Sequence, residues 1–276
     1  MFVVGGHGYV GSRVVDAADG AGDRVQVVNR DGSGRWGRPG VAWSDLAGVL
    51  EGRAPEPVVW LLDGVKHAEL DRLREFLGWV PAGSHVVFVS TCTVYGDRGG
   101  ASCAEDQPLD VRTAHARLKA EGERMLAASP LTWCVARLGA LYGVDERGAR
   151  VDRVEKWVTA AATTGTVVVP DPAHWRGWLH RDQAARALWR AARDRVSGTF
   201  NVASADLTFG RAAGLAAAPF AADVAGTAEG DPCDYRVNAG RARAAGHLDE
   251  RPGEDLAATV TDFVRQRYPD RQHRSG

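Results

Sequence analysis

The stretch that decides the fold is VVGGHGYVGS, residues 3–12. Its three glycines follow a short apolar run and stand where a helical pattern begins. Glycine permits a tight turn and lets backbone N–H groups approach a pyrophosphate at the positive end of a helix. The order of strand, glycine loop and helix therefore predicts a dinucleotide-binding loop. The residues expected in that loop are Gly5, His7, Gly8, Tyr9, Val10 and Gly11.

Short apolar runs alternate with longer helical patterns through the first half of the chain. Strands are predicted at residues 2–4, 25–28, 41–43, 58–62, 85–89 and 132–136, and helices from about residue 9, over 65–80 and over 113–128. Such alternation builds a parallel sheet with helices on both faces, and continuous apolar runs such as HVVFVS suit strands that are buried on both faces. The predicted fold class is α/β, a Rossmann-like doubly wound parallel sheet with a smaller C-terminal substrate lobe.

The second half of the chain breaks this rhythm with a proline-containing stretch, VVVPDPAHWRGW, and irregular segments around it. No repeat or low-complexity linker divides the sequence, so residues 1–276 are expected to form a single folding unit. Residues 1–142 should mainly form the dinucleotide-binding part. Residues 143–276 should mainly form the substrate-binding lobe, with 180–203 returning to the Rossmann part.

Composition narrows the classes of function. With 45% hydrophobic and 25% charged residues and a net charge of -1, the chain has no general attraction for nucleic acid or an anionic membrane. The four cysteines are scattered without a CxxC pair, which predicts neither a metal site nor a disulfide framework. No signal peptide and no apolar run of membrane-spanning length is found, so we expect a cytoplasmic protein.

The end of the second predicted strand bears on the choice between the two nicotinamide dinucleotides. The sequence there is VVNRD, and Asn29 and Arg30 favour a 2′-phosphate, which predicts NADP. In the alternative, Arg30 is a solvated loop charge and Asp31 holds the ribose, which leaves NAD possible. Asp45 and Leu46, after the third strand, are expected to line the adenine pocket.

Six motifs occur in the order and spacing of the extended short-chain dehydrogenase/reductase superfamily: GGHGYVGS, VSTCTVYG, HARLKAEGE, RLGALYG, RGWLHRDQAARA and GTFNVAS. The chain resembles the NAD(P)-dependent epimerase/dehydratase branch of that superfamily over nearly its full length. The resemblance implies a reaction set between the Rossmann part and the C-terminal lobe. It also places Leu62 and Asp63 along the cofactor channel, where small residues are usual.

The resemblance implies a working group of a Ser or Thr, a Tyr and a Lys. Thr91 and Lys119 match two of these positions, but His115 stands where the tyrosine is expected. Three roles are open for His115. It is a working acid/base, because imidazole titrates near neutral pH, or a relic in an enzyme of different chemistry, or a surface residue. The ammonium of Lys119 would disfavour the charged form of a neighbouring imidazole.

Further departures concern the substrate. Sugar-nucleotide dehydratases of this superfamily carry an acidic pair where this chain has Cys92 and Thr93, which argues against a standard 4,6-dehydratase. Cys92 is an acid/base candidate if its pKa is depressed, and a packing residue otherwise. The substrate-binding candidates are Thr93, Tyr95, Ala140 and Arg176. Ala140 replaces the family's asparagine near the substrate diphosphate, whereas Arg176 matches an arginine that grips a phosphate or, in the alternative, packs structurally.

We therefore expect an NADP-binding enzyme that acts on a keto group of a deoxysugar nucleotide or a natural-product intermediate, as a reductase or an epimerase-like enzyme. One alternative is a lyase, cyclase or isomerase with a retained or vestigial dinucleotide site, and another is a cofactor-sensing protein. The expected partners are a small-molecule substrate and, since relatives use the helix around 65–80 in dimers, a second copy of the chain. The substrate itself is not named by any motif.

Overall fold

Seven parallel strands form the main sheet of the protein, in the order β11-β7-β5-β4-β1-β2-β3. The structure, a computed structural model, describes residues 1–35, 37–62, 68–145, 152–227 and 230–269. The strands are β1 (Phe2–Val4), β2 (Gln26–Asn29), β3 (Gly40–Ala42), β4 (Pro57–Trp60), β5 (His85–Thr91), β7 (Thr132–Leu138) and β11 (Gly198–Val202). The predicted doubly wound parallel sheet is confirmed.

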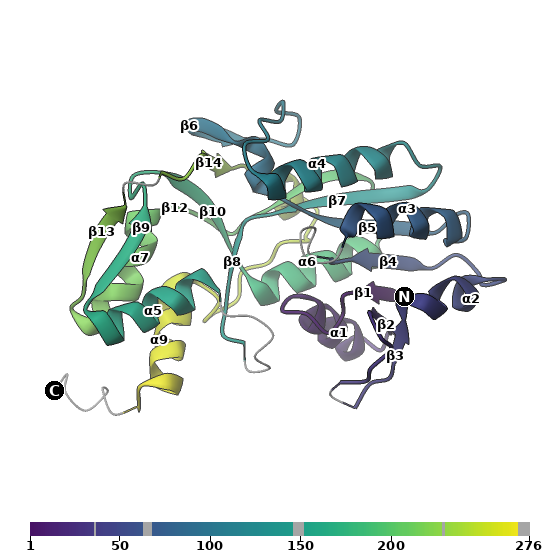
Figure 1. Ribbon diagram of the computed structural model, residues 1–276, viewed down its shortest axis with the longest axis horizontal. Helices are drawn as coiled ribbons and strands as arrows, with labels where there is room; N and C mark the ends of the chain where they lie inside the picture. Colours follow the sequence, from purple (N-terminus) through teal and green to yellow (C-terminus); the bar gives the residue numbers. More distant parts are fainter. Residues whose placement is uncertain (36, 63–67, 146–151, 228–229, 270–276) are drawn as a thin grey trace.

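Helices cover both faces of this sheet because its strands are apolar on both sides (Figure 1). On one face α1 (Gly11–Gly20) packs against α6 (Arg181–Arg193). On the other face lie α2 (Leu46–Leu50), α3 (Glu69–Trp79) and α4 (Ala114–Ala127). Helix α1 begins two residues later than predicted, because Tyr9 and Val10 still belong to the glycine loop.

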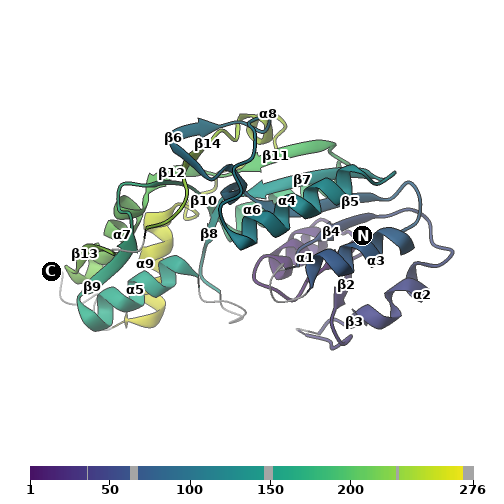
Figure 2. The same cartoon turned by 45° about the horizontal axis from the view of Figure 1, so that its top comes forward.

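The remaining elements build a smaller lobe beside the carboxyl edge of the sheet (Figure 2). Its apolar core is centred on Trp157, Trp178 and Phe209. Its helices are α5 (Arg153–Thr164), α7 (Phe209–Ala217) and α9 (Leu256–Arg267), and its strands are β8 (Ala140–Tyr142), β9 (Thr166–Pro170), β10 (Trp175–His180), β12 (Ala205–Thr208) and β13 (Asp223–Thr227). Two later elements, α6 and β11, do not belong to this lobe. Helix α6 packs on the main sheet, and β11 is its edge strand.

One strand pair joins segments from the two halves of the sequence. Strand β6 (Asp97–Cys103) pairs in parallel with β14 (Asp234–Val237), and α8 (Gly240–Ala244) follows (Figure 2). The short 3-10 turns are η1 (Trp43–Asp45), η2 (Cys92–Tyr95) and η3 (Ala218–Phe220). The predicted strand 41–43 ends one residue early because Trp43 begins such a turn.

Candidate active site

The glycine loop is a tight turn whose backbone excludes side chains at two positions. Gly5 has a φ of +84°, in the left-handed region that favours glycine. A Cβ at Gly11 would lie 2.2 Å from the carbonyl oxygen of Gly5. The turn is closed by a hydrogen bond of 2.9 Å from the amide of Gly8 to that same oxygen. These glycines bring the backbone of the loop to the start of α1. The amides of the loop therefore lie at the positive end of the helix dipole.

The side chains of the loop point in different directions. His7 lies toward the end of β2, where its Nδ1 is 3.0 Å from Nδ2 of Asn29, and burial lowers its pKa. The hydroxyl of Tyr9 donates to the carbonyl of Gly143 at 2.9 Å and to Asp152 at 3.0 Å, on the lobe side. Val10 is buried in the core between the sheet and α6. The loop therefore contacts both the second strand and the lobe.

The turn after β2 is organised by Asn29 itself. Its Nδ2 donates to the carbonyl of Ser33 at 2.7 Å, and its Oδ1 accepts from the amide of Gly32 at 2.6 Å. Arg30 and Asp31 are exposed beside it, and hydrogen bonds from Ser33 lower the pKa of Asp31. Asn29 thus shapes the turn and leaves Arg30 as the cation at the position expected for a 2′-phosphate.

A small cavity of about 50 Å³ lies between the glycine loop and β2. His7, Ser12 and Arg38 are among the residues that line it, and Arg38 also forms an ion pair with Asp19 of α1. Sequence reasoning missed Arg38. The available signal was the run of three arginines, at positions 30, 35 and 38, directly after the second strand.

The two residues expected at the adenine pocket differ in exposure. Asp45 is exposed, and one of its oxygens accepts from the hydroxyl of Ser44 at 3.0 Å. Leu46 is fully buried in the core with Trp60. The side chain of Leu46 therefore packs the interior and only its backbone remains for a ligand. Asp63 lies outside the described residues.

The end of strand β5 and the 3-10 turn η2 after it bring two hydroxyl groups, of Thr91 and Thr93, to the carboxyl edge of the sheet. The Oγ1 atoms of Thr91 and Thr93 lie 2.9 Å apart, and the amide of Thr93 donates to Oγ1 of Thr91 at 3.2 Å. Both side chains are half-buried. Since β5, β4 and β1 are neighbours in a parallel sheet, these hydroxyls lie at the same edge as the glycine loop.

Helix α4 carries His115 and Lys119 one turn apart. The helix begins after Thr113, whose hydroxyl accepts from the amide of Ala116 at 3.0 Å. His115 is half-buried in the first turn, and Lys119 is almost fully buried. Side chains four residues apart emerge on one face of a helix, so both belong to the same side of α4.

The ammonium of Lys119 is held by two acceptors. Its Nζ donates to the carbonyl of Leu62, after β4, at 2.9 Å, and to Oε1 of Glu69 at 2.7 Å. Leu62, expected at the cofactor channel, therefore fixes the lysine through its backbone. Sequence reasoning missed Glu69, because a glutamate near a helix start is ordinarily a solvated group, and only the fold brings α3 against α4.

Cys92 and Tyr95 face the interior. The thiol of Cys92 is fully buried and donates to the carbonyl of Arg137 at 3.2 Å, and burial raises its pKa. The hydroxyl of Tyr95 donates to Asn201 at 2.6 Å and accepts from Arg137 at 3.0 Å, and burial raises its pKa as well. The condition under which Cys92 was an acid/base candidate, a depressed pKa, is not met, and Tyr95 belongs to a buried polar network.

Arg176 is 2% exposed and closely surrounded within the lobe. It forms an ion pair with Asp231 and donates to the carbonyl of Cys233 at 2.5 Å. Its guanidinium lies 4.8 Å from the ring centre of Phe209 and 5.0 Å from that of Tyr235. These contacts favour the structural alternative for Arg176. Ala140 is half-buried at the start of β8, beside this core.

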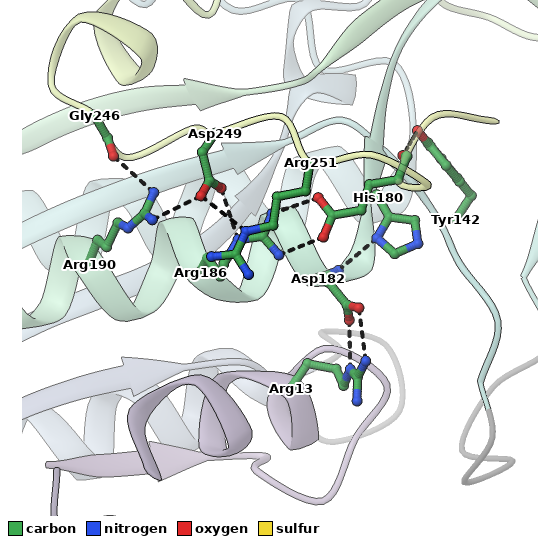
Figure 3. A network of polar contacts seen from close by, with 10 residues as sticks. Arg13, Tyr142, His180, Asp182, Arg186, Arg190, Gly246, Asp249 and Arg251 are labelled. Atoms are coloured by element: carbon green, nitrogen blue, oxygen red, sulfur yellow. Dashed lines mark hydrogen bonds and ion pairs between the residues drawn. The ribbon is translucent and has the colours of Figure 1, made fainter. Parts of the chain in front are cut away.

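A set of ion pairs ties the glycine-loop helix to α6 and to the segment before α9 (Figure 3). Arg13 of α1 contacts both oxygens of Asp182, and Arg186 contacts both oxygens of Glu254. With His180, these two carboxylates bring possible metal-ligand atoms within 4.8 Å of one another. Since each carboxylate already has a bidentate arginine, the cluster is suited to fixing the lobe rather than to holding a cation.

Residues 72–203 match the model of the NAD dependent epimerase/dehydratase family. Over these residues the match bears out the resemblance to NAD-dependent epimerases/dehydratases. No curated protein sequence matches the chain. Among the described residues, no helix is long and apolar enough to cross a membrane.

Solved structures show the same fold at low sequence identity. A UDP-glucose 4-epimerase from Thermus thermophilus, in complex with NAD, is 22% identical, with a TM-score of 0.74 over 95% of this chain and 98% of that one. A UDP-N-acetylglucosamine 4-epimerase from Bacillus cereus is 18% identical, with a TM-score of 0.75 over 96% and 95%. An NAD-dependent NDP-hexosamine 5,6-dehydratase of tunicamycin biosynthesis is 20% identical, with a TM-score of 0.75 over 98% and 99%.

Proposed function

We propose that the protein is an NAD(P)-dependent enzyme of the epimerase/dehydratase type. Its substrate is a small molecule with a keto or hydroxyl carbon, in the class of deoxysugar nucleotides or natural-product intermediates. The observation that carries this proposal is the convergence of the glycine loop, Thr91 and Lys119 at one edge of the sheet. A substrate-facing hydroxyl at the position of Thr91 has no evident purpose in a protein that only senses a cofactor.

The residues present fit a bound dinucleotide. Gly5 and Gly11 hold a turn that a side chain at either position would open, and its amides are suited to a pyrophosphate. Arg30 supplies positive charge at the end of β2, and Arg38, which is paired with Asp19, lines the cavity beside His7. We infer from this charge that NADP is preferred over NAD, since no carboxylate replaces Asn29 at the ribose position.

When bound, the dinucleotide supplies a hydride donor or acceptor. In this proposal the hydroxyl of Thr91, which contacts that of Thr93, hydrogen-bonds the oxygen of the reacting carbon. His115 is the candidate to hold or release the proton that accompanies hydride transfer, because imidazole changes charge near neutral pH. Lys119 is fixed one turn away on the same helix, where its charge acts on His115 and on a cofactor ribose.

Substitution of His115 tests this assignment. His115→Phe should reduce turnover by roughly a hundredfold or more, the usual scale for a positioned acid/base group. His115→Tyr should keep or raise activity, because it restores the donor that the family uses. Turnover of dTDP- and UDP-linked 4-keto sugars is followed by NADPH absorbance for net reduction and by chromatography of the products for epimerisation or dehydration, which consume no NADPH. The melting temperature of each variant is measured in parallel.

The outcome also separates the alternatives. Full turnover by His115→Phe contradicts the acid/base role. A tyrosine variant that gains nothing, in a protein that retains its dinucleotide through dialysis, favours a lyase, cyclase or isomerase. Dinucleotide binding without turnover of any keto sugar favours a sensor.

We further propose a homodimer formed through α4. An open groove of about 780 Å³ runs along this helix, and residues of β7 and β11 also line it. Its lining is largely apolar and includes Leu70, Leu109, Leu118, Trp133 and Val135. Arg117, Glu121 and Arg124 place both signs of charge along it, which suits a self-complementary contact.

A further inference from the structure

Glu69 and Lys119 form a buried ion pair beneath the candidate active site. Their side chains are 0% and 4% exposed, and Nζ of Lys119 lies 2.7 Å from Oε1 of Glu69. The same oxygen accepts from Nε1 of Trp60 at 3.1 Å. The ring of Phe88 lies below the ammonium, with its centre 5.1 Å from Nζ. In this apolar surrounding, the two opposite charges compensate each other.

The position of Glu69 strengthens its role as an anion. It is the first residue of α3, where the helix dipole favours a carboxylate. Asp71 also lies in this first turn, but it is exposed and pairs with Arg74. Glu69 is therefore the carboxylate that α3 presents to α4 in the interior.

The replacement of tyrosine by His115 changes what the lysine charge does. A tyrosine is neutral when protonated and anionic when not, so a nearby cation helps it to release a proton. A histidine is cationic when protonated, so the same cation opposes the form that donates a proton. A lysine whose charge is compensated removes this conflict.

We propose that Glu69 is a positioning residue that neutralises Lys119 and thereby allows His115 to carry a proton near neutral pH. This inference rests on the proposed function, in which His115 is the proton donor. Glu69 acts through its ion pair with Lys119. It compensates, from another helix, for the exchange of the family's tyrosine.

Among the described residues of α4, two further glutamates are paired with arginines. Glu123, one turn beyond Lys119, is paired with Arg137 by two hydrogen bonds of 3.1 Å and 2.7 Å. Glu121 pairs with Arg124 on the exposed side of the helix. The end of β5 and the turn η2 contribute the hydroxyls of Thr91 and Thr93. Asp63 lies outside the described residues.

The titration of His115 tests the inference without substrate or cofactor. The protein is labelled with ¹⁵N-histidine, the imidazole of His115 is assigned by its loss in His115→Asn, and its pKa is measured by NMR. Glu69→Gln keeps the shape of the side chain and removes one negative charge, so the pKa of His115 should fall by roughly half a unit to one unit. Asp71→Asn removes the same charge from the exposed side of α3 and should leave that pKa unchanged.

A second pair of variants measures the same coupling between Glu69, Lys119 and His115 if Glu69→Gln does not fold. Lys119→Met leaves the carboxylate alone and should raise the pKa of His115. The double variant Glu69→Gln/Lys119→Met removes both charges and should return that pKa to the wild-type value. An unchanged pKa in Glu69→Gln, or equal values in Lys119→Met and the double variant, overturns the inference.

The outcomes distinguish this inference from the proposed function. If the wild-type protein turns over no keto sugar while the pKa of His115 follows the variants as expected, the electrostatic coupling stands and the proposed reaction is wrong. If turnover depends on His115 but its pKa ignores Glu69, the reaction stands and Glu69 only packs. In an active enzyme, Glu69→Gln should also move the basic limb of the pH–rate profile to lower pH by the same amount as the titration.

Discussion

Gly11→Ala is expected to disable the dinucleotide loop while the rest of the protein stays folded. A Cβ at this position would lie 2.2 Å from the carbonyl oxygen of Gly5, whereas Cβ contacts under 3.0 Å essentially never occur. The loop backbone must therefore move by about 0.8 Å, the difference between these distances. A shift of this size takes about two amide donors out of hydrogen-bonding range of a pyrophosphate.

Each hydrogen bond to a charged group contributes about 1.5–3 kcal/mol, so dinucleotide affinity should fall by roughly a hundredfold or more. Isothermal titration with NADPH and NADH measures this loss. Gly20→Ala is the matched control, because it lies at the other end of the same helix and its Cβ would meet nothing within 4 Å. The control should bind normally and gain up to about 1 kcal/mol of stability. If folded Gly11→Ala binds as tightly as this control, the loop does not hold the pyrophosphate.

The other predictions concern cofactor choice, assembly and acid stability. Arg30→Ala should lower the ratio of NADPH to NADH affinity by roughly tenfold or more, and an unchanged ratio in paired titrations rules out the phosphate contact. Leu118→Glu should convert the dimer to a monomer in light scattering, and a monomeric wild type contradicts the proposed interface. Burial lowers the pKa of His85 from 6.5 to about 4. Between these values the unfolded chain binds a proton that the folded one does not, so the free energy of unfolding falls by up to about 3 kcal/mol as pH falls through this window. His85→Asn should flatten this slope in urea unfolding, and a slope that persists assigns it to other groups.

The strands of the main sheet were predictable because each carries its own signal. A parallel strand buried on both faces is a continuous apolar run, and residues 85–89 and 132–136 mark β5 and β7 within two residues. Strands β6 and β14 gave no such signal. The sequence of β6, DRGGASC, is polar and rich in glycine, and its partner lies more than a hundred residues away. Its strand conformation comes from tertiary pairing rather than from local preference.

The candidate site also has residues that the sequence predicts and surroundings that it does not. Residues fixed by motif spacing, such as Thr91 and Lys119, could be placed at the carboxyl edge of the sheet from the sequence. What surrounds them could not be placed, because burial and partners depend on how helices pack. Glu69 meets Lys119 only through the contact of α3 with α4. The pKa of Cys92 is likewise set by its complete burial, which no spacing reveals.

The surroundings of Arg176 limit how a substrate can be held. A phosphate could reach this guanidinium only by displacing Asp231, and breaking a buried ion pair on one side costs about 3–5 kcal/mol. The rings of Phe209 and Tyr235 also lie against the guanidinium, and the carbonyl of Cys233 accepts from it. Arg176 therefore joins β10 to the segment before β14 in this conformation. An anionic substrate must be bound by other groups, or must supply more than that free energy when it takes the place of the carboxylate.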